Sequence, residues 1–152
     1  MTSVEKIQNE IVEELSLFTD WIEKYEYLIE LGKDEIDFDK KFMKDEFLIN
    51  GCQSKVWLYA KQNNSKVTFH AYSDAIMTKG IIALLIKVFS NQSPDDIINS
   101  KLDFIDKIGL KSHLSATRAN GLMSMIKQIK IYAIELLLQN PYLYGYLVNN
   151  DE

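Results

Sequence analysis

Cysteine is nearly absent from this sequence: among its 152 residues, Cys52 alone carries a thiol. One thiol cannot form an internal disulfide, and it cannot supply the several sulfur ligands of a four-thiolate zinc site or an iron–sulfur cluster. The chain is long enough to bury roughly 70% of the surface that its unfolded form exposes, so a core can form without cross-links. Cys52 is therefore expected either to pack as a small apolar side chain or to react with another molecule.

Positive charge and long apolar runs are also scarce. The chain has 17 Lys and Arg residues against 22 Asp and Glu residues, for a net charge of −5, which argues against a basic surface for nucleic acid. The longest apolar run, residues 81–86, is far shorter than the ~20 residues of a membrane helix. The first residues contain acid and no apolar stretch typical of a secretory signal. We therefore expect no nucleic acid partner, no membrane partner, and a cytoplasmic location, where thiols stay reduced.

Two amphipathic helices are predicted in the first third of the chain. The first begins with capping-box spacing at residues 2–5 and continues with apolar residues at helical intervals. A break is expected near residues 19–20, followed by a second helix over residues 21–31, with Gly32 as a left-handed terminator. Residues 33–46 are densely charged and lack a sustained period, which predicts a connecting loop.

A β-hairpin is predicted in the middle of the chain. Residues 55–61 and 66–72 are rich in β-branched and aromatic side chains, and the polar residues 63–65 separate them. The alternation within each run predicts one face toward the core and one mixed face. The residues expected on the core face are Val56, Leu58, Ala60, Val67, Phe69 and Ala71.

Helices are predicted again after the hairpin. Ser73 and Asp74 offer acceptors for the first amides of a helix that runs to about Phe89 and is apolar on nearly every side, which predicts deep burial. Short helices are expected from Pro94, which Ser93 precedes as a cap, and over residues 104–108.

The last predicted helix begins after Ser115. Gly109 is expected to end the short helix before it, and Pro141 to end the long helix itself. Residues 141–152 are expected to form a loosely attached peripheral tail. The order of helices, hairpin and helices predicts a single α+β domain over residues 1–152, in which a small antiparallel sheet is covered by helices.

Cys52 is the first candidate for chemistry. It follows Gly51, and glycine lets the backbone adopt positive φ values or lets another molecule approach closely. The alternative is an inert, buried thiol, because reactivity requires exposure and a lowered pKa that a sequence does not show.

Histidine, lysine and arginine offer weaker candidates. His70 and His113 are the only histidines, and with Cys52 they follow no known metal-ligand spacing. Each is expected in a structural role, His70 as a partly exposed hairpin residue beside Thr68 and Tyr72. A Cys-His-Asn hydrolase lacks a local signature here, and a Schiff-base enzyme using Lys55 or Lys79 lacks a phosphate-cradling glycine loop. The single arginine, Arg118, is a candidate partner for an anion or a thiolate.

Four elements in order resemble the SufE family over about residues 5–135. They are Leu28-Ile29-Glu30-Leu31-Gly32, Gly51-Cys52-Gln53-Ser54-Lys55-Val56-Trp57-Leu58, Ala71-Tyr72-Ser73-Asp74-Ala75 and Ser112-His113-Leu114-Ser115-Ala116-Thr117-Arg118-Ala119-Asn120-Gly121-Leu122. The Gly-Cys-Gln-Ser-x-Val-Trp element is the most specific of them.

The resemblance implies a sulfur acceptor in iron–sulfur cluster assembly. Such a protein takes persulfide sulfur from a SufS-type cysteine desulfurase, stimulates its turnover, and delivers the sulfur to a downstream Suf scaffold. It is not itself an enzyme, and the pyridoxal phosphate belongs to the desulfurase. The implied fold is shared with IscU-type scaffolds, but one cysteine is too few for a scaffold.

The resemblance also assigns residues. Cys52 matches the acceptor cysteine, and a lone thiol suits a carrier because a second thiol would invite an internal disulfide. Gly51, Gln53, Ser54, Asp74, Arg118 and His70 are supporting candidates, with no metal site. Arg118 is expected to lower the thiol pKa or hold the loop, and Asp74 to cap the buried helix or meet a partner. Cys52 is expected to be sheltered in a pocket against the hairpin, and the acidic connector to join residues 51–53 in a docking surface. The alternative function is an adaptor that stimulates the desulfurase without carrying sulfur.

Overall fold

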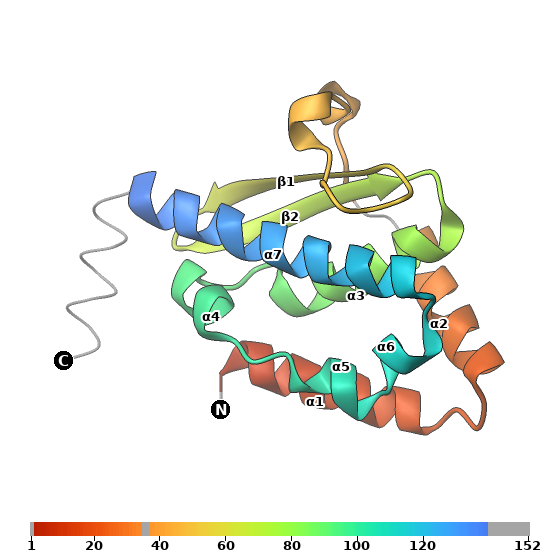
Figure 1. The fold of residues 1–152 in the computed structure, drawn as a ribbon. Helices are drawn as coiled ribbons and strands as arrows, with labels where there is room; N and C mark the ends of the chain where they lie inside the picture. The colour runs from red at the N-terminus through yellow and green to blue at the C-terminus, as the bar shows by residue number, and fades with distance from the viewer. Residues whose placement is uncertain (1, 35–36, 140–152) are drawn as a thin grey trace.

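The fold is built from one β-hairpin and helices on either side of it in sequence (Figure 1). The computed structural model describes residues 2–34 and 37–139. The helices are α1 (Ser3–Ser16), α2 (Trp21–Lys33), α3 (Ile76–Phe89), α4 (Pro94–Asn99), α5 (Asp103–Lys107), α6 (Leu110–His113) and α7 (Ala116–Gln139); the strands are β1 (Val56–Asn63) and β2 (Lys66–Ser73); two 3-10 turns are η1 (Lys40–Phe42) and η2 (Asp45–Phe47). The predicted α+β class is confirmed.

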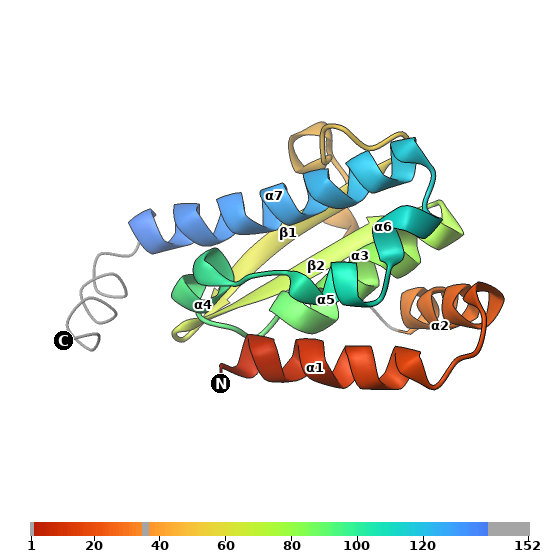
Figure 2. The same cartoon turned by 60° about the horizontal axis from the view of Figure 1, so that its bottom comes forward.

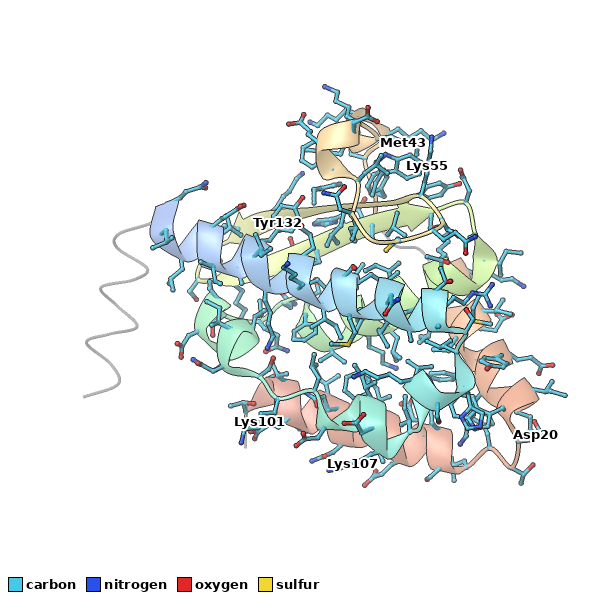
Figure 3. All side chains as sticks on the ribbon, in the orientation of Figure 1. Asp20, Met43, Lys55, Lys101, Lys107 and Tyr132 are labelled. Carbon is cyan, nitrogen blue, oxygen red and sulfur yellow. The ribbon has the colours of Figure 1, made fainter. Side chains whose placement is uncertain are left out.

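The first two helices begin where the sequence predicts. The hydroxyl of Thr2 accepts from the backbone N–H of Glu5 at 3.2 Å, and the Glu5 carboxylate accepts from the N–H of Thr2 at 3.0 Å. This reciprocal pair is a capping box. Asp20, at the corner between α1 and α2 (Figure 3), accepts from the N–H of Glu23 at 2.9 Å. Side-chain caps therefore set both helix starts.

Gly32 does not end α2, so the prediction of a left-handed terminator there is wrong. The helix continues to Lys33, and Gly32 is buried inside it. A Cβ atom on Gly32 would lie 2.9 Å from the backbone nitrogen of Gly80, and one on Gly80 would collide with the carbonyl of Leu28. The two glycines thus let the backbones of α2 and α3 approach closely. The left-handed terminator predicted at Gly109 is confirmed, with φ of 70°.

The hairpin has the predicted strands and faces. Leu58 pairs with Ala71 and Ala60 with Phe69, and the positive φ of Asn64 turns the chain between the strands. The residues predicted for the core face are buried, except Ala60, which is partly buried. This face lies toward α3, and Tyr132 of α7 donates its hydroxyl to the carbonyl of Leu58 at 2.7 Å (Figure 3).

The described part of the charged connector, residues 37–46, covers the other face of the hairpin. It contains the turns η1 and η2 and lies on the side of the strands away from α3 (Figure 1). Phe42 stacks on Tyr59 with ring centroids 3.8 Å apart, and the N–H of Asp39 donates to the Tyr59 hydroxyl at 3.1 Å. Tyr59 and Trp57 are therefore buried on the face that the sequence leaves mixed.

Helix α3 is the buried centre of the structure, as its apolar sequence predicts. Its buried residues include Ile81, Ile82 and Leu85, and α1 lies beneath it on the side away from the hairpin (Figure 2). The predicted cap at Asp74 is wrong. The helix starts one residue later, with Ala75 at the N-cap position and no side-chain cap, while Asp74 is exposed.

Helices α4, α5 and α7 agree with the sequence where they are described, whereas α6 was not predicted. The hydroxyl of Ser93 accepts from the N–H of Asp96, and that of Ser115 from the N–H of Arg118, both at 3.2 Å. The prediction of one domain over residues 1–152 stays a prediction, and Pro141 with the tail 141–152 lies outside the described residues. None of the described helices is long and apolar enough to cross a membrane.

The close crossing of α2 and α3 predicts a specific cost for a methyl group. Gly80→Ala is expected to lower the free energy of unfolding by about 2 kcal/mol, because overpacking a close contact typically costs 1–3 kcal/mol. Gly121→Ala in α7 is the matched control, since its Cβ would make ordinary contact at 3.5 Å and alanine favours helix. Urea unfolding of both variants measures the difference, and equal midpoints would contradict the crossing.

Candidate functional site

Cys52 lies in a short loop between the connector and β1. The N–H of Ile49 donates to the carbonyl of Val56 at 2.9 Å, which closes the base of the loop. Gly51 has a φ of 91°, a conformation that strains any residue with a Cβ atom. A side chain on Gly51 would also collide with the hydroxyl of Ser124 on α7. Backbone conformation and close packing therefore both require glycine here.

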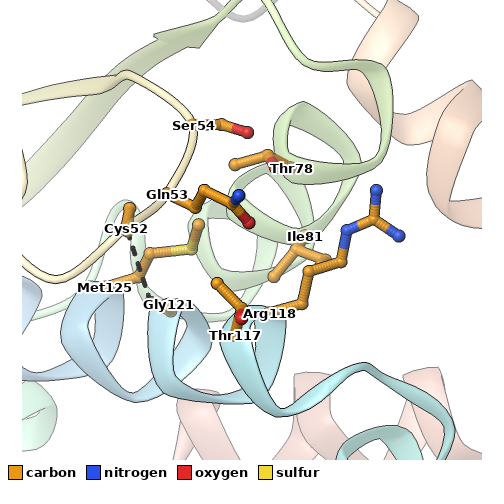
Figure 4. A pocket seen from close by; sticks show the side chains of 9 residues that line it. All are labelled: Cys52, Gln53, Ser54, Thr78, Ile81, Thr117, Arg118, Gly121 and Met125. Atoms are coloured by element: carbon orange, nitrogen blue, oxygen red, sulfur yellow. Dashed lines mark hydrogen bonds between the residues drawn. The ribbon is translucent and has the colours of Figure 1, made fainter.

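The thiol itself points toward α7. Its sulfur lies 3.6 Å from the carbonyl oxygen of Gly121, so the S–H group can donate to it (Figure 4). Cys52 is half-buried at the edge of a cavity of about 70 Å³. The residues that line the cavity are Cys52, Gln53, Ser54, Thr78, Ile81, Thr117, Arg118, Gly121 and Met125. The thiol is thus sheltered as predicted, but by α3 and α7 rather than by the hairpin.

Burial raises the pKa of the Cys52 thiol above its ordinary value, because a charged thiolate is poorly solvated there. A carbonyl acceptor acts in the same direction, since it binds the protonated form and repels the thiolate. The expected effect of Arg118 is not seen in this conformation. Its guanidinium lies on the far side of Gln53 from the sulfur (Figure 4). Cys52 is therefore a weak nucleophile while it rests in the cavity.

The structure brings some of the predicted supporting residues together. Gln53, Ser54 and Arg118 line the same cavity as Cys52, and Gly51 shapes the loop beside it. Asp74 lines a different cavity, next to Tyr72 and the connector.

The two histidines lie away from the thiol cavity. His70 stacks on Tyr59 and its Nδ1 donates to the carbonyl of Asp37 at 2.8 Å. His113 stacks on Trp21. Neither lines the thiol cavity, and within residues 2–34 and 37–139 no three His, Cys, Asp or Glu side chains gather as a metal site requires.

Several lining residues were missed by sequence reasoning. Thr117, Gly121 and Met125 follow one another at four-residue spacing, so they lie along one face of α7. Thr78 and Ile81, three residues apart, share a face of α3 in the same way. That spacing is visible in the sequence. What the sequence hides is that these two helix faces meet at the Cys52 loop.

Comparison with known proteins identifies the family. The family model described as SufE, an Fe-S metabolism associated domain, matches residues 9–133. This chain belongs to the SufE family. An uncharacterized SufE-like protein of Rhizobium meliloti (strain 1021) is 36% identical over 135 residues, which cover 86% of this chain and 94% of that protein. The resemblance of the four sequence elements is thereby confirmed, and the SufE-family chain has a role in Fe–S metabolism.

Two further comparisons concern a named relative and the fold. The cysteine desulfuration protein SufE of Wigglesworthia glossinidia brevipalpis is 33% identical over 134 residues, covering 87% of this chain and 93% of that protein. The solution structure of a hypothetical protein from Thermus thermophilus aligns with a TM-score of 0.68 at 15% identity, covering 87% of this chain and 96% of that one. The second likeness shows a shared fold alone.

The raised pKa predicts slow alkylation of the folded SufE-family protein. Cys52 is expected to react more slowly with iodoacetamide in the native protein than in urea, and the rate should reach half its maximum at a higher pH when folded, because only the thiolate attacks. Mass spectrometry across a pH series measures both rates. A native rate equal to or above the unfolded one would show that the thiol is not sheltered.

The fit of Gly51 against α7 predicts that a methyl group displaces the loop. Gly51→Ala is expected to speed native alkylation of Cys52 at least about fivefold, since positive φ costs an alanine about 1 kcal/mol or more and the side chain meets Ser124. Adding Ser124→Gly should recover part of the shelter by removing the collision. Ser124→Gly alone is the control. An unchanged alkylation rate in Gly51→Ala would contradict the close packing of Gly51 against α7.

Proposed function

We propose that this protein accepts sulfur at Cys52 from a SufS-type cysteine desulfurase and passes it to a downstream Suf scaffold during iron–sulfur cluster assembly. One observation carries the proposal: the only thiol of a SufE-family chain lies at the edge of a cavity, on a loop that reaches the surface. The name of the Wigglesworthia relative, a cysteine desulfuration protein, supports the same role.

The proposed reaction is an exchange between a thiolate and a persulfide. The Cys52 thiolate attacks the terminal sulfur of the desulfurase persulfide, a new S–S bond forms on Cys52, and the old S–S bond breaks to release the desulfurase thiolate. The proton lost from Cys52 passes to solvent or to that leaving thiolate. A second exchange of the same kind transfers the sulfur onward, so no net oxidation occurs and no cofactor is required on this chain.

The cavity offers room for the transferred atom. Its volume of about 70 Å³ exceeds the ~10–15 Å³ that a cavity needs to hold a water molecule, which supports room for an added sulfur atom beside Cys52. Ile81 and Met125 supply apolar walls, and Gln53 and Thr117 supply polar groups. A persulfide held here would be protected from oxidants and from stray thiols.

Shelter and attack require different positions of Cys52. The buried thiol is protonated at neutral pH, and the nucleophile is the thiolate. Docking of the desulfurase must therefore move the loop out of the cavity, where solvation and nearby cations favour ionisation. Arg118 is exposed near the mouth of the cavity, so its guanidinium is the cation of this chain best placed to meet the displaced thiolate.

The docking surface proposed for the desulfurase includes the loop at residues 51–53 and the connector. The connector lies near the loop, because Leu48 at its end pairs with Trp57 next to the loop's exit. Its exposed charges are mixed, with Asp39 and Asp45 among lysines. The protein acts only with its partners in this scheme, as a cytoplasmic carrier rather than an enzyme, and the pyridoxal phosphate belongs to the desulfurase.

The carrier role predicts one added sulfur on one residue. After incubation with a SufS-type desulfurase and cysteine, intact-mass spectrometry is expected to show a sulfur adduct that a reductant removes, and peptide mapping should place it on Cys52. Cys52→Ala should abolish both the adduct and most of the stimulated turnover. Ser65→Ala, at an exposed serine in the hairpin turn that does not line the cavity, is the control and should retain both.

The adaptor alternative makes the opposite prediction for the same variants. An adaptor would stimulate the desulfurase by contact alone, so Cys52→Ala would stimulate fully and no adduct would form. Arg118→Ala separates a further role: slower adduct formation at unchanged binding would place its effect on the thiolate. Weaker binding would place it at the interface.

A further inference from the structure

Two aromatic residues of α2 hold the turn that precedes α7. The indole ring of Trp21 stacks on the imidazole of His113 with centroids 3.9 Å apart and an interplanar angle of 16°. One helical turn later, the hydroxyl of Tyr25 donates to the carbonyl of His113. We refer to Trp21, Tyr25 and His113 as the aromatic clamp. His113 belongs to a motif that the thiol site itself does not use.

Further contacts hold the clamp in place. The Nδ1 of His113 donates to the carbonyl of Gly109 at 3.0 Å, which closes the α6 turn. Gly109, in its left-handed conformation, lies against the ring of Trp21, because a Cβ atom there would be 3.7 Å from the indole. Asp20 caps α2 immediately before Trp21. In Figure 1, α6 lies next to α2 and leads directly into α7.

The turn held by the clamp leads within two residues to the cap of α7. Ser115 accepts from the N–H of Arg118 through its hydroxyl at 3.2 Å and from the N–H of Ala119 through its carbonyl at 2.9 Å. The first turn that Ser115 fixes carries Thr117 and Arg118, which line the thiol cavity. The next turn carries Gly121, the acceptor for Cys52.

No residue of the clamp lines the thiol cavity. The clamp can therefore act on Cys52 only through elements that line the cavity, and the shortest connection along the chain runs from His113 through Ser115 into α7. The first turn of a helix is where the backbone has fewest internal hydrogen bonds, so external contacts decide how firmly it is held. Here the external contact ahead of that turn comes from α2.

We propose that the aromatic clamp positions the first turns of α7 against the Cys52 loop and thereby controls access to the thiol. Trp21, Tyr25 and His113 are positioning residues in this view, and they touch neither sulfur nor partner. The effect of the clamp on the thiol does not depend on sulfur transfer. Its use to the protein rests on the proposed function, since a carrier needs a thiol that stays sheltered until its partner docks.

The test compares two tyrosines of the same helix. Tyr25→Phe removes the hydroxyl that donates to His113. Tyr27→Phe removes a hydroxyl that donates to Glu14 of α1 at 2.6 Å, away from α6. Each substitution deletes one oxygen, but Tyr27→Phe also deletes a second hydrogen bond, which the Tyr27 hydroxyl accepts from Lys87 at 3.2 Å. Tyr27→Phe should therefore lower overall stability at least as much as Tyr25→Phe, which urea unfolding measures, and this makes it a stringent control. Native alkylation of Cys52 by iodoacetamide, with no desulfurase present, is the readout.

Tyr25→Phe is expected to speed alkylation about 2- to 10-fold, the factor that corresponds to the net worth of one hydrogen bond. As the pH is raised, the alkylation rate of Tyr25→Phe should begin to increase at a lower pH than that of the unsubstituted protein, because a loosened cavity solvates the thiolate better. Tyr27→Phe should leave the rate and its pH profile unchanged. Trp21→Leu should speed alkylation of Cys52 more than Tyr25→Phe does. If Trp21→Leu fails to fold, the alkylation rate of Tyr25→Phe alone decides the test.

Two results would overturn the proposal. An unchanged rate in Tyr25→Phe would show that the clamp does not control the thiol, and an equal increase in Tyr27→Phe would show a general loss of stability. Neither result depends on sulfur transfer. Failure of the clamp thus leaves the sulfur adduct on Cys52 intact, whereas failure of the carrier role removes the adduct and leaves the alkylation difference.

Discussion

The contact between the Cys52 loop and α7 is the constraint on which the site depends. The loop lies directly on the helix because Gly51 leaves room for Ser124, and the carbonyl of Gly121 accepts from the Cys52 thiol. A larger residue at Gly51 would meet both strain and collision. The position of the thiol is therefore decided by the absence of side chains as much as by any attraction.

The contact between the Cys52 loop and α7 protects the thiol but also lowers its reactivity. Burial and a carbonyl acceptor favour the neutral thiol, which protects it from oxidation, and each unit of raised pKa costs about 1.4 kcal/mol to form the thiolate in place. A carrier must form that thiolate when its partner arrives. The conflict disappears if the cavity is a resting position, because the energy needed to leave it can come from docking.

The sequence predicts the local structure well where the signal is local. The caps at Thr2, Ser93 and Ser115 and the two strands of the hairpin were predicted correctly, because side chains and backbone within a few residues determine them. The predictions at Gly32 and at Asp74 are wrong, and Gly32 shows a physical reason. Gly32 has the composition of a terminator but serves a contact with Gly80, far away in the sequence, and tertiary contacts override local propensity.

The residues of the candidate site also separate into those that a local motif identifies and those that only the fold brings together. Cys52 and its neighbours Gln53 and Ser54 could be identified because a short motif carries them, and Arg118 because its motif is also recognisable. The walls formed by Thr78 and Ile81 could not, since they belong to the packing of α3 beside α7 and have no distinctive local pattern. Asp74 and His70 were predicted as supporting residues because they lie in or beside a recognised motif. Neither lines the thiol cavity, so such a position in the sequence does not by itself bring a residue to the thiol.

The aromatic clamp, too, could be predicted only in part from the sequence. His113 is part of a recognised motif, yet its partners Trp21 and Tyr25 lie in the second helix of the chain, where the sequence shows only an amphipathic pattern. A motif marks residues that matter, but the physical reason lies with whatever they contact in the fold. For His113 that contact is an aromatic ring on α2, and its effect on the thiol runs through the backbone of α7 rather than through any atom in the cavity.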